Sequence, residues 1–193
     1  MLDAGVKWAI EALDTLDSED TLTPVHRLEL SFRYKIKDWI LSAVSGLVDR
    51  QEGRKLLRLI SNDDVKQMGT CSFILIVKGI EAIQAARTSV AINPPGTHHC
   101  PQCRLHQQEQ ICTRVWQDFW YTTIPHAILA PNQPLSLLSL VAFLQKAKIN
   151  NLRDTCKSLT LFHFEKTDVL KVETSVKDRL ASAIWELHQE GRM

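Results

Sequence analysis

The chain has 193 residues, of which 45% are apolar and 23% are charged, a length and composition typical of one globular domain and not of a disordered segment. Its 23 Lys and Arg residues are balanced by 22 Asp and Glu residues, so the basic excess typical of nucleic-acid binding proteins is absent. No run of ~18 apolar residues occurs, which argues against a membrane-spanning helix. We therefore expect neither nucleic acid nor a membrane among the partners of the chain.

Residues 1–16 are expected to form an amphipathic helix, because apolar residues recur in them at steps of three and four. These residues are Leu2, Val6, Ile10, Leu13 and Leu16. The charged residues between them argue against a secretory signal peptide. We therefore expect an intracellular protein, cytoplasmic or nuclear, whose five cysteines stay reduced and form no disulfide framework.

Helical periodicity continues up to residue 87. Thr23 followed by Pro24 is typical of an N-cap and the first position of a helix. Ser61 followed by Asp63 and Asp64 indicates a second helix start. Helices are expected around the apolar positions Val25, Leu28 and Phe32; Ile36, Trp39, Ile40, Val44 and Leu47; Leu56, Leu57 and Ile60; Val65 and Met68; and Phe73, Val77, Ile80 and Ile83.

A loop rich in Cys, His and Pro is expected at residues 88–104, because the Asn-Pro-Pro-Gly run at 93–96 cannot continue a helix. Helical spacing then resumes and recurs to the end of the chain. Residues 158–164 alternate in part, as a short strand would, but no partner strand is evident and we assign them to a helix. The prediction is an all-α antiparallel stack of about seven to nine helices, in which regions 1–87 and 105–193 pack as one domain.

Sequence motifs for catalysis are missing. The chain contains no Gly-x-Ser-x-Gly, no phosphate-binding Gly-x-x-x-x-Gly-Lys-Ser/Thr, no dinucleotide-binding glycine pattern and no His-Glu-x-x-His. Trp116, Phe119, Trp120 and Tyr121 follow helical spacing, which favours packing in the core over a ligand site. We therefore expect no enzyme activity.

The Cys-Pro-Gln-Cys run at 100–103 has the spacing with which two thiolates bind one zinc ion. A helix that starts near Leu105 would put Cys103 and Cys112 ~13 Å apart, too far to share one ion, whereas His106 would share a helix face with Cys103. The predicted metal ligands are therefore Cys100, Cys103, His106 and Cys156, with His99 and Cys112 as alternates.

Two other interpretations of this loop stay open. In the first, its cysteines and histidines are ordinary loop side chains that hold no metal. In the second, Cys-Pro-x-Cys at a helix start is a redox pair with a lowered thiol pKa, although such pairs belong to a βαβ context that this sequence lacks. The expected cofactor is accordingly either none or one structural zinc ion.

Several short motifs follow one another in a fixed order. They are Thr23-Pro24-Val25 with Tyr34-Lys35-Ile36 and Trp39-Ile40, the helices from Gly69 to Arg87, Cys100 and Cys103, Trp116 with Phe119-Trp120, the turn Leu129-Ala130-Pro131-Asn132-Gln133-Pro134-Leu135, and Cys156. In this order, over residues 5–190, they resemble the helical region that follows the BTB/POZ domain in BTB-domain proteins of mushroom-forming fungi. The sequence itself contains no BTB domain, and its turn lacks the histidines of the family pattern.

The resemblance implies protein–protein contact as the role of this region. We therefore expect a non-catalytic protein-interaction or scaffold segment with a protein partner. The alternative is a small zinc-stabilised or redox-active helical protein that uses Cys100 and Cys103. A third hypothesis is a diverged fragment that depends on a BTB domain it has lost.

Overall fold

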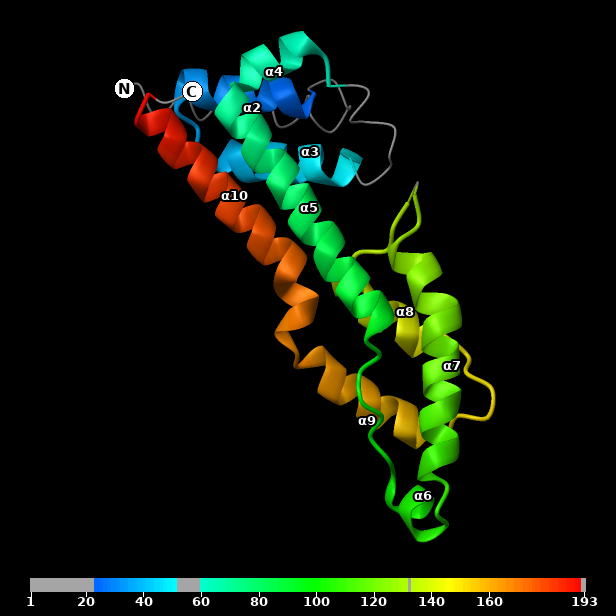
Figure 1. Cartoon of the computed structure of the whole chain (residues 1–193). Coiled ribbons are helices and arrows are strands. Elements are labelled where there is room, and N and C mark those ends of the chain that lie inside the picture. Colours follow the sequence, from blue (N-terminus) through cyan, green and yellow to red (C-terminus); the bar gives the residue numbers. More distant parts are fainter. Residues whose placement is uncertain (1–22, 52–59, 132, 192–193) are drawn as a thin grey trace.

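Figure 1 shows the computed structural model of the chain, which describes residues 23–51, 60–131 and 133–191. These residues form nine α-helices and one 3-10 helix and contain no strand, which confirms the all-α class. The elements are α2 (Pro24–Tyr34), α3 (Asp38–Gln51), α4 (Asn62–Met68), α5 (Thr70–Ile92), α6 (Pro101–Leu105), α7 (Glu109–Ile128), α8 (Leu137–Lys146), α9 (Asp154–Glu165), η1 (Asp168–Lys171) and α10 (Val172–Gln189). The helix expected at 1–16 and the positions Leu56 and Leu57 lie outside the described residues.

The two helix starts expected from the sequence are confirmed. The Thr23 side chain caps α2 and accepts a hydrogen bond from the His26 backbone N–H at 3.2 Å. At α4 the Ser61 hydroxyl accepts from the Asp64 N–H at 3.1 Å, and the Asp64 carboxylate accepts from the Ser61 N–H at 2.8 Å. Such a capping box satisfies backbone donors that the helix itself leaves unpaired. Local hydrogen bonds therefore determine where these helices begin.

The loop between the two halves starts later than expected. Helix α5 continues to Ile92, so the irregular segment begins at Asn93 and not at residue 88. Val90 and Ala91 are buried in the core, and this burial favours the helix up to the point where Asn93 precedes a proline and leaves the helical conformation. Residues 158–164 lie within α9, which confirms their assignment to a helix.

Two clusters of buried side chains form the interior. The N-terminal core consists of Val25, Leu28, Phe32, Ile40, Ala43, Val44, Leu47, Val48, Met68, Ile76, Ile80, Ile83, Val176, Leu180 and Ile184. The C-terminal core consists of Val90, Ala91, Cys100, Cys103, Cys112, Trp116, Trp120, Ile124, Ile128, Leu137, Leu140, Val141, Leu144, Leu152, Cys156, Leu161, Phe164 and Leu170. Helix α5 contributes to both cores and packs along α10, so these two long helices connect the halves (Figure 1).

The aromatic residues of α7 pack inward as predicted, with one exception. Trp116 and Trp120 are fully buried, and their indole N–H groups donate to the carbonyls of Pro95 and Val90, each at 3.1 Å. Tyr121 is instead 52% exposed. It follows Trp120 directly, and successive helical residues point ~100° apart. The hydrogen bonds of the Trp116 and Trp120 indoles hold α7 against the end of α5 and the segment after it.

Within the described ranges, no single helix is long and apolar enough to cross a membrane. Helices α4 and α5 together meet the same test of length and composition, but they are bent by 103°. Gly69 lies at this bend with a φ of 81°, in the region that favours glycine.

Helices α5 and α10 approach closely at Gly79, where an added β-carbon would lie 2.2 Å from Cδ1 and 3.1 Å from Cγ of Leu180. We expect Gly79→Val to lower the free energy of unfolding by about 1–3 kcal/mol through overpacking, as measured by urea denaturation. The same change should cost less in a Leu180→Ala background, which opens space at the contact. Gly96→Ala is the control, because a β-carbon there meets nothing within 4 Å. An equal loss at both glycines would contradict the close approach.

A buried ion pair joins α5 to the first turn of α10. Arg87 Nε lies 2.6 Å from Glu173 Oε1, and the two side chains are 5% and 7% exposed. We expect Glu173→Gln to lower the free energy of unfolding by about 3 kcal/mol or more, because it removes the negative charge from a buried, hydrogen-bonded ion pair. The exposed pair of Lys171 and Asp168, 3.4 Å apart, provides the control: Asp168→Asn should cost less than about 1 kcal/mol. Similar losses in both denaturation curves would show that burial of the first pair does not matter.

Candidate metal centre

Four buried cysteines from separate parts of the chain meet at one end of the C-terminal core. Cys100 is the N-cap of α6 and Cys103 lies within that helix, whereas Cys112 and Cys156 lie in the first turns of α7 and α9. The exposed fraction of each is at most 4%. The remaining cysteine, Cys71, is exposed on α5. The fold therefore separates one surface thiol from four that share the interior.

The sulfur atoms of the buried cysteines are spaced like ligands of one ion. Cys103 Sγ lies 3.6 Å from Cys112 Sγ and 3.5 Å from Cys156 Sγ. The sulfurs of Cys100, Cys103 and Cys156 all lie within 4.8 Å of one another. In a tetrahedral zinc site, Zn–S bonds of ~2.3 Å separate the sulfur ligands by ~3.8 Å. The two shortest separations therefore come close to those of zinc-bound thiolates.

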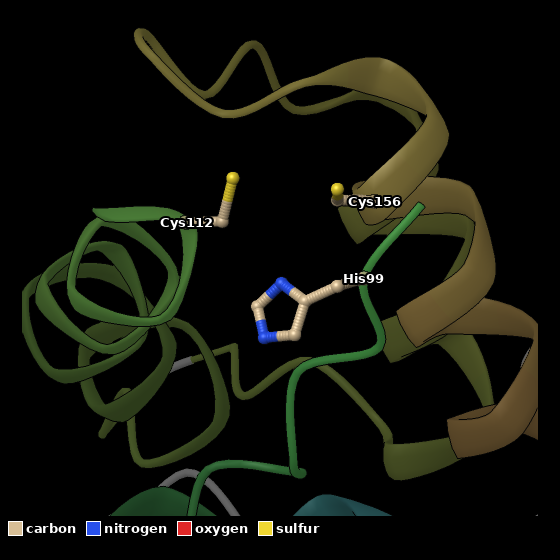
Figure 2. Close-up of side chains that lie close together, drawn as sticks. All are labelled: His99, Cys112 and Cys156. Carbon is tan, nitrogen blue, oxygen red and sulfur yellow. The ribbon is translucent and has the colours of Figure 1, made fainter. Parts of the chain in front are cut away.

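His99 adds a nitrogen donor beside two of these sulfurs, as Figure 2 shows. A ring nitrogen of His99 and the sulfurs of Cys112 and Cys156 lie within 4.8 Å of one another. Nε2 of the ring lies 3.2 Å from Thr113 Oγ1, whereas Nδ1 is buried and has no hydrogen-bond partner among the described residues. In Figure 2, Nδ1 is the ring nitrogen on the side of the two sulfurs.

The surroundings of the thiols change their acidities in opposite directions. Hydrogen bonds from the Thr155 hydroxyl and from the Cys103 N–H lower the pKa of Cys100 to about 6. Burial raises the pKa of Cys103 and of Cys156, because it disfavours a thiolate far from water. A divalent cation would compensate the charge of these thiolates, so metal binding would displace their protons.

Further hydrogen bonds, at the sulfur cluster and around it, fix α6 against the start of α9. The Cys100 N–H donates to Cys156 Sγ at 3.4 Å. The guanidinium of Arg153, the residue before α9, donates to the side-chain carbonyls of Gln102 at 3.0 Å and Gln108 at 2.8 Å. These contacts hold α6 and the start of α7, and with them Cys103, in place relative to Cys156.

Of the predicted ligands, the structure brings together Cys100, Cys103 and Cys156, together with both alternates, His99 and Cys112. His106 does not join them. It caps the C-terminus of α6, is exposed to solvent, and belongs to neither group of potential ligands among the described residues.

The separation of ~13 Å expected between Cys103 and Cys112 for a continuous helix is wrong, because their sulfurs are in contact. Helix α7 starts at Glu109 and not near Leu105. The chain turns at Gln107, whose φ is 53°, and the Gln108 N–H then donates to the Cys103 carbonyl at 2.9 Å. This reversal returns the first turn of α7 to α6. A non-glycine residue in the left-handed region is uncommon, so the sequence carries no signal for it.

Comparison of the chain with family models, curated proteins and solved structures finds no match. The resemblance to the region after the BTB/POZ domain therefore stays a prediction.

Proposed function

We propose that the chain is a non-catalytic helical scaffold that binds a partner protein, and that one structural zinc ion holds its C-terminal core together. One observation carries the zinc part of this proposal: the buried sulfurs of Cys103, Cys112 and Cys156 converge from three helices. Cys100 and His99 lie beside them. The cluster thus offers at least the four ligands that a structural zinc site requires.

The donor set favours a structural ion over a catalytic one. A catalytic zinc ion has three protein ligands and keeps a fourth position open for water or substrate. Here a fourth and a fifth protein donor stand next to the three shared sulfurs. The cysteines are also almost completely buried, which leaves no route for a substrate to reach an ion among them.

The irregular chain at 93–100 shows why this end of the molecule would need a crosslink. It forms no helix, and isolated hydrogen bonds attach it to the core. The His98 N–H donates to Thr160 Oγ1 at 2.9 Å, and the Pro95 carbonyl accepts from the Trp116 indole. A zinc ion bound to α6, α7 and α9 would fix these segments together, because the free energy of metal binding adds to that of folding.

The redox alternative rests on the lowered pKa of Cys100. Its thioredoxin-like form requires a strand next to the Cys-x-x-Cys helix, and the part of the chain that the structure describes contains no strand. The structural metal site accounts for more of the cluster, because it also uses Cys112 and His99.

The scaffold part of the proposal is supported by exposed apolar side chains next to the metal centre. Leu105, at the end of α6, is 80% exposed, and Ile111, in the first turn of α7, is 57% exposed. Leu105 follows Cys103 by two residues and Ile111 directly precedes Cys112, so both lie on the elements that carry proposed ligands and are available for contact with a partner. A metal ion that fixes α6 against α7 would also fix these two side chains relative to each other. The resemblance to post-BTB helices points to the same role.

We expect the protein purified without added metal to carry about one zinc ion per chain in elemental analysis. Chelation should lower its melting temperature by more than about 5 °C, because the bound ion stabilises only the folded state. Cys112→Ser and Cys156→Ser should lose most of the zinc. Cys71→Ser, at the exposed thiol, is the matched control and should keep both the zinc and the melting temperature.

Three results together would rule out the structural metal site: a zinc content below about a tenth of an equivalent, no uptake of added zinc, and an unchanged melting temperature after chelation. Equal zinc loss in the Cys71→Ser control would show that the metal binds thiols without regard to the site.

We expect the tagged chain to capture a partner protein in stoichiometric amount from a cell lysate, and the double change Leu105→Ser and Ile111→Ser to abolish that capture. The reason is that both side chains expose apolar surface beside the metal centre. Leu138→Ser is the control, because Leu138 is 67% exposed on α8 and lies on a different element. If the partner is retained by the double variant, the contact surface lies elsewhere; if no stoichiometric partner exists and a substrate is turned over, the scaffold proposal is wrong.

A further inference from the structure

The metal centre has five donors for an ion that takes four. The sulfurs of Cys103, Cys112 and Cys156 are close to one another, because Cys103 Sγ contacts both Cys112 Sγ and Cys156 Sγ, and the last two lie within 4.8 Å of each other. We take these three as the common part of the ligand set. The fourth position is open to Cys100, which lies beside Cys103 and Cys156, or to His99, which lies beside Cys112 and Cys156. The contacts of these two side chains differ in a way that distinguishes them.

His99 has an unused donor atom that faces the sulfurs. Its Nδ1 is buried with no hydrogen-bond partner among the described residues, and a buried polar atom without a partner destabilises the folded state. Figure 2 shows this nitrogen on the side of the Cys112 and Cys156 sulfurs. A metal ion among those sulfurs would supply the missing partner.

The contact with Thr113 is compatible with metal binding by Nδ1 of His99. Thr113 Oγ1 lies 3.2 Å from His99 Nε2. When Nε2–H donates to the hydroxyl, the neutral ring carries its proton on Nε2 and keeps the Nδ1 lone pair free for a metal. Histidines that bind metals are usually fixed through the other ring nitrogen in this way.

Cys100 is already engaged without a metal. Its backbone N–H donates to Cys156 Sγ at 3.4 Å, which is a contact that orients a ligand from outside the coordination sphere. Cys100 therefore already acts on the cluster through its N–H, whereas Nδ1 of His99 has no partner among the described residues.

Charge favours the same choice. Zinc with four thiolates carries two negative charges, whereas zinc with three thiolates and a neutral imidazole carries one. The four cysteines are at most 4% exposed, and excess charge is costly to bury. The set with the imidazole leaves less uncompensated charge in the core.

We infer that the ion is bound by Nδ1 of His99 and the sulfurs of Cys103, Cys112 and Cys156, and that Cys100 lies outside the coordination sphere and supports Cys156 by a hydrogen bond. This inference rests on the proposed zinc site and assigns its ligands. It also gives the two cysteines of the Cys-x-x-Cys pair different roles: Cys103 binds the ion, and Cys100 supports a ligand.

The test uses the full chain loaded with zinc and X-ray absorption at the zinc edge. We expect three sulfur ligands and one nitrogen ligand in the wild type, and the same spectrum in Cys100→Ser. His99→Ala should lose the nitrogen ligand from the spectrum. It should also weaken zinc binding by about tenfold to a hundredfold, as measured by a competition titration. His98→Ala is the matched control, because His98 stacks on His163 with ring centroids 3.7 Å apart and belongs to neither ligand group; it should bind zinc like the wild type.

Four sulfurs and no nitrogen in the wild-type spectrum would overturn the ligand assignment and leave the structural zinc site standing. Loss of a sulfur ligand in Cys100→Ser, with an unchanged spectrum in His99→Ala, would overturn it as well. Absence of bound zinc from the wild-type chain would instead overturn the metal site itself. The wild-type spectrum gives the number of nitrogen ligands even if a variant fails to fold, and the two variants identify the residues.

Discussion

Contact between the sulfurs of Cys103, Cys112 and Cys156 is the constraint on which the C-terminal half of the molecule depends. Cys112 and Cys156 follow Cys103 by 9 and 53 positions along the chain. The contact therefore requires three helices to meet at one point. The reversal at Gln107 and the bonds of Arg153 to Gln102 in α6 and to Gln108 at the start of α7 support this convergence. Burial raises the pKa of Cys103 and Cys156, because a thiolate far from water is disfavoured unless a cation compensates its charge.

The two halves of the molecule are stabilised by different kinds of interaction. The N-terminal core is a cluster of aliphatic and aromatic side chains, whereas four cysteines contribute to the C-terminal core. Arg87 lies on α5 between Ile83, which belongs to the first core, and Val90, which belongs to the second. Its buried pair with Glu173 sits where α5 passes from one core to the other. Since a buried charge must find its partner, the pair fixes the position of α10 along α5 at that junction.

The sequence predicted those parts of the fold that local interactions determine. The starts of α2 and α4 were readable because Thr23 and Ser61 bond to backbone groups three residues away. The all-α class followed from periodicity, which reports helix faces directly. The start of the loop was missed because only the packed core shows that Val90 is buried at the end of α5.

The candidate site was predictable in part for the same reason. The spacing of Cys100 and Cys103 has a recognised pattern, and both lie in the cluster. The place of Cys112 depends on a left-handed residue between two helices, which a spacing rule for a continuous helix cannot contain. His99 has no spacing signal at all. The sequence prediction therefore names it only as an alternate ligand. What favours it over the other histidines is the unpartnered Nδ1, an observation that exists only once the side chains are placed in space.

The Cys-x-x-Cys pattern suggests that both of its sulfurs bind the same ion, yet the contacts around this pair are unequal. Cys103 Sγ contacts the sulfurs of both Cys112 and Cys156, whereas Cys100 is bonded to Cys156 through its backbone N–H. Under the proposed ligand set, the first cysteine acts through its N–H on Cys156, and a histidine next to it in sequence takes the coordination position. A loop of this kind fixes its metal through residues that touch the ion and neighbours that orient them. In this proposed set, protein donors would fill all four positions of a tetrahedral ion, as in structural zinc sites, and this is the physical ground for the proposal that the ion is part of the scaffold.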